Sequence, residues 1–383
     1  MKKIRLILLI VCLVIFLGIL YYNNAIKLKY NKATNMSYSV IFDKDNNEIC
    51  RLENSSNYIN SYFVDAVVEE VINQISLKEN IDKNIAAKKL YNGGYSIYTT
   101  CDLNKQRKLE EIYLNSNYFE NDAVQSAAVV IDYKSGDIVA LIGGRGEKSA
   151  NRIYNRATTL KKAPGNVFNI LSVYAPAIEK GVITKDTIYV DEPLEETNYK
   201  PKNSDLKFRG EVTIKQAVDL SLNIIPIKVL KDIGIDYSYD FIKKIGIKSV
   251  LESDKNLASL ALGGLNKGVN IIEMASAFGT IGNDGEYIES KLYTKILYNS
   301  ESYIENETGS NIVMKKSTTE ELKSLLKIDN TDIYSKYTTN NKSNTSLYGF
   351  NNNYSVGIWY GYENNNEIKS FENVKLILNQ IIK

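Results

Sequence analysis

The pattern of hydrophobic and polar positions separates an apolar N-terminal run from a globular remainder. Residues 6–26 contain no charged side chain, and three basic residues precede them. About 20 apolar residues span a membrane as a helix, and a basic cluster on the N-terminal side favours an N-in, C-out orientation. We therefore predict a cytoplasmic tip and transmembrane anchor at residues 1–26 and a polar linker at 27–36. A cleaved signal peptide is the alternative, but no good small-x-small cleavage site follows the run.

The segment from residue 37 to 124 alternates strand patterns with amphipathic helix patterns. Period-2 alternation around a polar turn predicts a strand hairpin, and apolar positions three and four residues apart predict helices. The expected elements are strands at 38–42, 48–52 and 95–100 and helices at 62–75, 81–91 and 102–113. Asp102 is the expected N-cap of the last helix, because its carboxylate accepts backbone N–H groups of the first turn.

Beyond residue 125, two apolar strands at 127–131 and 138–142 form the clearest hairpin of the chain. Both strands are apolar on both faces, which predicts a sheet covered by helices on both sides. Helical patterns follow at 167–180, 212–234, 271–278 and 320–327, then a strand at 354–362 and a helix at 371–382. Strands at both ends of this segment, with a helical block between them, predict a mixed α/β (α+β) domain with a helical insert.

Composition and charge exclude several classes of catalytic and binding site. The chain has 383 residues, a formal net charge of +2 and no histidine. That charge balance predicts no nucleic-acid partner, and the missing histidine excludes Ser-His-Asp catalysis, Cys-His catalysis and HExxH zinc sites. We expect no metal and no other cofactor. Cys50 and Cys101 lie in apolar, strand-like settings, where two buried thiols are the favoured interpretation and a disulfide between them is the alternative.

Three short polar stretches carry the candidate chemistry. Asn166 and Asn169 lie one helical turn apart, where a glycine-containing loop enters a predicted helix. Ser221 and Asn223 follow within the helical block, and residues 336–339 (Lys-Tyr-Thr-Thr) precede the last strand. Taken alone, the second stretch is also typical of a packing or N-cap Ser-x-Asn, and the third of a solvated polar loop.

Several longer segments match one family pattern in one order. They are residues 93–102 (GGYSIYTTCD), 128–144, 155–165, 199–210, 221–223, 262–285 and 349–362. Together they resemble the class A penicillin-binding proteins, membrane-anchored enzymes that build peptidoglycan outside the bacterial cell. The resemblance implies the penicillin-binding-protein and serine β-lactamase-like transpeptidase fold, a mostly antiparallel sheet flanked by helices plus a helical lobe. It also implies a shortened pedestal or linker domain at 37–124 and a transpeptidase-like domain at 125–383.

The resemblance places the family's S-x-x-K motif on residues 166–169. In the family, the serine is the nucleophile and the lysine takes its proton, since one helical turn brings the two side chains together. Here both positions hold asparagine, as Asn166 and Asn169. An asparagine amide is a poor nucleophile and does not titrate near neutral pH. We therefore expect no functional catalytic residue at either position and no acylation by substrate or β-lactam.

The other two family motifs are retained in part. The S-x-N motif falls on residues 221–223, where the resemblance implies that the serine relays a proton and the asparagine orients substrate. The K-T-G-T motif falls on residues 336–339. Lys336 and Thr339 remain, while Thr338 occupies the glycine position; a one-residue gap in the alignment is the alternative. A side chain at that position would stand where substrate is expected to approach the backbone closely.

Two further observations bear on catalysis. The family carries a glycosyltransferase domain between its anchor and the strand at 95–100, and the intervening segment is too short for one, so we expect no glycan polymerisation. Other S-x-x-K patterns begin at Ser204 and Ser324, but neither opens a helix after a glycine turn, and Ser172 has no lysine three residues on. We expect none of these serines to act as a substitute nucleophile.

The expected function follows from the resemblance and the altered motifs. It is that of a membrane-anchored, penicillin-binding-protein-like protein of peptidoglycan biosynthesis, catalytically inactive and structural or regulatory in role. It would cross the bacterial cell membrane once, with its C-terminal domain outside, and contact peptidoglycan stem peptides and active cell-wall synthases. The alternatives are an active or weakly active serine-type D,D-transpeptidase that binds penicillin, and a non-covalent muropeptide or β-lactam sensor.

Overall fold

The computed structural model describes residues 38–53, 58–194, 200–340, 342–364 and 366–382. The chain divides into two compact units: unit 1 holds Met1–Tyr58, Val68–Thr99 and Tyr293–Asn306, and unit 2 holds Ile59–Val67, Thr100–Leu292 and Glu307–Lys383. The expected transmembrane anchor and linker lie outside the described residues. No helix within the described ranges is both long enough and apolar enough to cross a membrane.

Unit 1 is built on a five-stranded sheet with the order β10-β9-β3-β1-β2. Its elements are β1 (Ser39–Phe42), β2 (Glu48–Leu52), β3 (Tyr95–Thr99), β9 (Tyr293–Tyr298), β10 (Glu301–Glu305), most of α2 (Tyr62–Glu79) and α3 (Lys83–Tyr91). The predicted hairpin β1–β2 is confirmed, and β1 also pairs in parallel with β3. The Ser39 hydroxyl donates to the Leu90 carbonyl at 2.6 Å, which ties α3 to β1. The sequence pattern missed β9 and β10.

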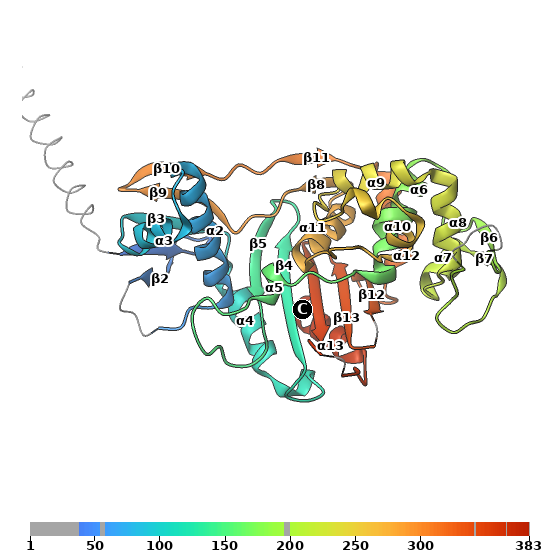
Figure 1. The fold of residues 1–383 in the computed structure, drawn as a ribbon, viewed down its shortest axis with the longest axis horizontal. Helices are drawn as coiled ribbons and strands as arrows, with labels where there is room; N and C mark the ends of the chain where they lie inside the picture. The colour runs from blue at the N-terminus through green and yellow to red at the C-terminus, as the bar shows by residue number, and fades with distance from the viewer. Residues whose placement is uncertain (1–37, 54–57, 195–199, 341, 365, 383) are drawn as a thin grey trace, which may run out of the picture. The chain divides into compact units, whose positions relative to one another are not determined.

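The sheet of unit 2 positions the candidate site. Its five strands follow the order β12-β13-β14-β4-β5, and each neighbouring pair is antiparallel. They are β4 (Gln125–Asp132), β5 (Asp137–Ile142), β12 (Tyr334–Asn340), β13 (Asn344–Phe350) and β14 (Tyr354–Gly361). The prediction of helices on both faces is confirmed. Helix α11 (Ile271–Gly282) packs against one face, and α4 (Leu103–Leu114) and α13 (Glu372–Ile382) pack against the other (Figure 1).

Two neighbouring residues of β14 face opposite sides of the sheet, one toward α11 and the other toward α13. A Cβ on Gly357 would lie 2.7 Å from the carbonyl oxygen of Ile271, so the missing side chain lets α11 approach the sheet closely. Successive side chains of a strand point to opposite faces. Val356 accordingly lies on the other face, beside Ile381 and Ile382 of α13.

The remaining elements of unit 2 are shorter. Its helices are α5 (Arg156–Thr159), α6 (Ala175–Glu179), α7 (Ile214–Asp219), α8 (Ile224–Ile233), α9 (Ile235–Lys244), α10 (Leu257–Leu262) and α12 (Lys316–Leu326). Its 3-10 and π helices are η1 (Ser116–Tyr118), η2 (Gly165–Phe168), η3 (Ile170–Tyr174) and η4 (Glu252–Asp254). Two small sheets pair β6 (Ile188–Asp191) with β7 (Gly210–Thr213) and β8 (Glu286–Ile288) with β11 (Ser310–Ile312).

Four sequence predictions need correction. The single helix predicted at 212–234 is strand β7 followed by two helices, α7 and α8, and the helix predicted at 167–180 is a 3-10 turn, a π segment and a short α-helix. Both irregularities fall on the motif residues. The solvated loop offered as an alternative for residues 336–339 is wrong, because they lie in β12. Cys101 is a buried thiol, as favoured, whereas the Cys50 thiol is half-buried.

Candidate active site

The segment aligned with the nucleophile is a 3-10 helix. Asn166 lies in η2, and the backbone N–H of Asn169 donates to the Asn166 carbonyl, which is the i to i+3 bond of that geometry. Side chains three residues apart eclipse each other in a 3-10 helix, so both asparagines face the same way. The sequence predicted that the two side chains share a face, although the prediction assumed an α-helix.

Asn169 is buried, whereas Asn166 is half-buried with a shielded amide oxygen. Asn169 is 4% exposed. Asn166 Oδ1 is buried and accepts no hydrogen bond from any residue that the structure describes. A buried acceptor without a donor costs on the order of 1–3 kcal/mol. Asn166 is therefore not the residue that packing alone would favour here.

The second motif forms the break between α7 and α8. Ser221 has a φ of 51°, which places a non-glycine residue in the left-handed region and ends α7. The Ser221 N–H donates to the Val218 carbonyl at 3.1 Å, and Leu222 is 2% exposed and anchors the turn. No glycine marks this break. Pro226 lies in the first turn of α8, where proline is tolerated, but the pattern of hydrophobic positions alone predicted a continuous helix.

A buried carboxylate network fixes the asparagine of the second motif. The Asn223 N–H donates to Asn203 Oδ1 at 2.8 Å, and the Asn223 side chain donates to the Lys202 carbonyl at 2.8 Å. Asn203 Nδ2 in turn lies 3.0 and 2.9 Å from the two carboxylate oxygens of Asp191, which is 1% exposed. Asp191 was not among the site residues predicted from the sequence. The only feature of the sequence that could have indicated Asp191 is its place as an acidic residue at the end of a short strand. That strand precedes the matched segment that contains Asn203.

Lys336 brings the second and third motifs together. Its Nζ donates to Ser221 Oγ at 2.8 Å and to the Val218 carbonyl. Burial lowers the pKa of Lys336 to about 8; Asp219 opposes this shift and Lys215 adds to it. A lysine with this pKa is partly neutral at neutral pH, so it can exchange a proton with the hydroxyl it touches.

Thr338 is the residue at which the resemblance places the family's motif glycine. On a strand, alternate residues share a face. Thr338 therefore lies on the same face of β12 as Lys336, and it is 4% exposed. Tyr337 lies on the opposite face, with Lys375 of α13 over its ring at 4.8 Å. The Thr339 backbone pairs with Thr345, and its side chain lies outside the described residues.

Packing places these parts at one edge of the sheet. Segment η2 contacts both the edge strand β12 and α10, and β12 supplies the lysine that reaches Ser221. The structure thus joins Ser221 and Lys336 by a direct contact and lays the Asn166–Asn169 segment against the same strand. Within the described ranges, no group of three His, Cys, Asp or Glu side chains is arranged to hold a metal ion.

The alternative serines are placed differently. Ser172 is fully buried, and its hydroxyl donates to the carbonyls of Phe168 at 2.9 Å and Leu260 at 2.6 Å. The hydroxyl of Ser324 donates to the Glu321 carbonyl within α12. Ser204 is exposed in the loop before β7. None of the three has the lysine contact that Ser221 has among the described residues.

The Lys336 contact predicts a pH-dependent stability. The folded chain holds the pKa near 8, below the ordinary 10.5, so the unfolded chain binds the extra proton between these values. Unfolding free energy should therefore rise as pH increases from 8 toward 10.5, by on the order of 2 kcal/mol, and the full penalty applies below pH 8. Lys336→Met should flatten this rise, whereas Lys134→Met, at an exposed lysine, should keep it.

Urea unfolding at pH 7.5, 8.5 and 9.5 would measure this slope. Trp359 is the only tryptophan of the chain and is buried in β14, so its fluorescence reports unit 2. An equal pH dependence in the natural chain and Lys336→Met would show that Lys336 is not desolvated as described.

Comparison with known proteins identifies the family. The model of the penicillin binding protein transpeptidase domain matches residues 126–349, more than half of the chain. Penicillin-binding protein 1A of Clostridium botulinum is 33% identical over 279 residues, covering 68% of this chain and 32% of that protein. Its counterpart in Clostridium perfringens is 31% identical over 343 residues, covering 76% and 48%. The chain therefore belongs to the penicillin-binding protein transpeptidase family. It spans between about a third and a half of the length of these two relatives.

Solved structures support the fold. PonA1 of Mycobacterium tuberculosis in complex with penicillin V aligns with a TM-score of 0.67 at 19% identity, covering 82% of this chain and 90% of that one. Penicillin binding protein 3 of Mycobacterium tuberculosis aligns with a TM-score of 0.70 at 14% identity, covering 90% and 94%. These alignments confirm the transpeptidase fold expected from the sequence.

Proposed function

We propose that the chain serves peptidoglycan biosynthesis as a pseudo-transpeptidase, which keeps the fold and part of the site but forms no acyl-enzyme. One observation carries this proposal. The segment aligned with the nucleophile is folded and packed against β12, yet presents two amides, Asn166 and Asn169, where acyl transfer needs a hydroxyl and a base. The role is then structural or regulatory.

The proposed setting is the outer face of the bacterial cell membrane. A single N-terminal helix at residues 6–26 would hold the chain there, within reach of stem peptides and of active cell-wall synthases. The retained contact between Ser221 and Lys336, with Asn223 held beside it, supports non-covalent recognition of a stem peptide. Co-purification with an active synthase would favour a scaffold role, and muropeptide binding measured by calorimetry would favour a sensor.

Fluorescent penicillin provides the direct test. The natural chain should show no labelled band after denaturation, and its intact mass should not change after incubation with penicillin. A saturable band that survives denaturation, with the matching mass increase, would overturn the proposal. Glycan-chain elongation by the purified protein should likewise be absent.

A second candidate is residual acyl transfer at Ser221. The observation in its favour is the 2.8 Å contact with Lys336, whose pKa of about 8 makes it the best available base beside a hydroxyl. Under this alternative, penicillin labels the natural chain and Ser221→Ala abolishes the label. Asn166→Ala would leave the label in place, which separates this outcome from reaction near the aligned site.

A further inference from the structure

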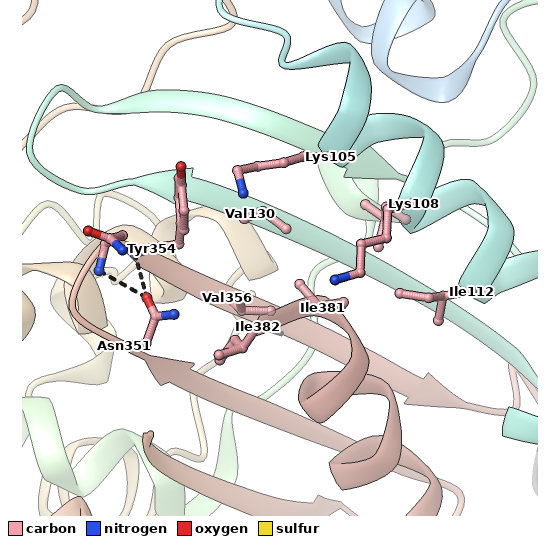
Figure 2. Close-up of a pocket in the computed structure, with 11 residues that line it drawn as sticks. Lys105, Lys108, Ile112, Val130, Asn351, Tyr354, Val356, Ile381 and Ile382 are labelled. Carbon is pink, nitrogen blue, oxygen red and sulfur yellow. Dashed lines mark hydrogen bonds between the residues drawn. The ribbon is translucent and has the colours of Figure 1, made fainter. Parts of the chain in front are cut away.

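A cavity lies on the sheet face opposite α11. It has a volume of about 240 Å³ and opens between α4, α13 and the strands β4 and β14 (Figure 2). Its apolar lining consists of Leu109, Ile112, Val130, Val356, Ile381 and Ile382. Leu109, Val130 and Val356 are each less than 5% exposed, so the floor belongs to the core of unit 2. None of the motif residues lines this cavity.

Two ammonium groups enter the cavity from α4. Lys105 Nζ lies 4.1 Å from the centroid of the Tyr354 ring, which holds it over the cavity. Lys108 lies three residues on, on the same side of the helix, and its Nζ points toward the same space (Figure 2). Neither lysine forms an ion pair within the part of the chain that the structure describes.

Asn351 adds a fixed neutral donor. Its Oδ1 accepts the N–H groups of Asn353 at 2.9 Å and Tyr354 at 2.8 Å, which sets the orientation of the amide. The Nδ2 group then faces the cavity (Figure 2) and makes no hydrogen bond to any described residue. Two cationic donors and one neutral donor therefore surround the same apolar floor.

Among the residues that the structure describes, no carboxylate lines the cavity. The acidic side chain placed closest by strand register is Asp132, which pairs with Tyr354 across the sheet. Its Oδ1 accepts the N–H of Lys134 at 3.0 Å, in the turn that follows β4. Within the described ranges, the positive charges at the cavity have no acidic partner, so an anionic ligand would neutralise them.

We propose that this cavity binds a small amphiphilic anion, with an aliphatic body of about eight carbons and an oxyanion head. The volume corresponds to about eight waters at the roughly 30 Å³ that each occupies in the liquid, which suits a short single chain. The chain covers the apolar floor, and the head accepts from Lys105, Lys108 and Asn351. An apolar cavity with a few convergent polar groups is the usual form of a small-molecule site.

Calorimetry on the full-length chain tests the proposal with four probes of one tail length. Octanoate and monooctyl phosphate, well below their micelle-forming concentrations, should bind more tightly than about 1 mM. Octanol and octylammonium should bind at least tenfold more weakly, since neither neutralises the lysines. The tighter of the two anions assigns the head as a carboxylate or a phosphate. Equal binding of octylammonium and octanoate, or binding of neither anion, would overturn the proposal.

Matched variants locate the binding. Lys105→Gln with Lys108→Gln removes both charges from the cavity and should weaken octanoate binding about tenfold. Arg107→Gln removes one exposed charge from the same helix, outside the cavity, and should leave binding unchanged. All three positions are at the surface of α4, so Trp359 fluorescence should confirm unaltered folding. An equal loss in Arg107→Gln, or no loss in the double variant, would contradict the assignment.

Discussion

A double variant, Asn166→Ser with Asn169→Lys, is expected to acquire a covalent fluorescent-penicillin label that the natural chain lacks. The eclipsed i and i+3 positions of η2 place the new hydroxyl and amine together. The gain in acylation rate should be at least about 10³-fold, because a nucleophile and its base act as a unit. Each single variant should therefore remain near the unlabelled background.

The local structure should accommodate serine at position 166 more easily than lysine at position 169. Serine at 166 removes the buried amide oxygen that accepts no hydrogen bond from the described residues, so it should not destabilise the fold. Lysine at 169 enters a position that is 4% exposed, where burial would lower its pKa and make it a better base. Its extra length requires local adjustment, which Trp359 fluorescence during urea unfolding would detect.

Thr338 provides the control for an unlabelled double variant. Its side chain lies on the face of β12 that carries Lys336, at the position where the resemblance places the family's glycine. If the folded double variant remains unlabelled and a triple variant with Thr338→Gly gains the label, the block lies at Thr338 and the site is otherwise competent. If neither labels while both remain folded, the idea that the rest of the site is intact is refuted.

The sequence predicted those parts of the fold in which local pattern and tertiary packing agree. The apolar runs of β4 and β5 by themselves predict a sheet covered on both faces. The carboxylate of Asp102 caps α4, as predicted, by accepting the N–H groups of Asn104 and Lys105, both at 3.1 Å. Family resemblance then set the order of the motifs. The shared face of Asn166 and Asn169 followed from spacing alone, since three residues bring side chains together in either helix type.

The parts that the sequence missed depend on partners far away in the chain. The break at Ser221 has no glycine, and the hydroxyl there is held by Lys336, 115 residues later. Strand β12 is polar and resembles a loop, but it pairs along its length with β13, whose residues are all buried. Asp191 gains its role only because it accepts the amide of Asn203, whose own oxygen accepts the Asn223 N–H. Local propensity contains none of this information.

Gly263→Ala should destabilise unit 2 by about 2–4 kcal/mol and disturb the segment that carries Asn166. Gly263 ends α10 with a φ of 70°, and a Cβ there would lie 2.1 Å from the carbonyl oxygen of Gly165, with its carbonyl carbon and nitrogen at 2.7 Å. The obstructing atoms are backbone, so they cannot turn aside as a flexible side chain would. Strain in φ and displacement of η2 therefore add together.

Alanine variants of two other glycines separate the cost of φ strain from the cost of displacing η2. Gly264 has ordinary φ and its nearest obstructing atom is 3.8 Å away, so Gly264→Ala should be nearly neutral. Gly181 has a φ of 75° and open space around its Cβ position, so Gly181→Ala should cost about 1 kcal/mol from φ strain alone. Urea unfolding followed by Trp359 fluorescence should rank them Gly264, Gly181, Gly263 in increasing cost. If Gly263→Ala cost no more than Gly181→Ala, α10 would not be the support on which the Asn166 segment rests, and the preserved geometry of that segment would need another cause.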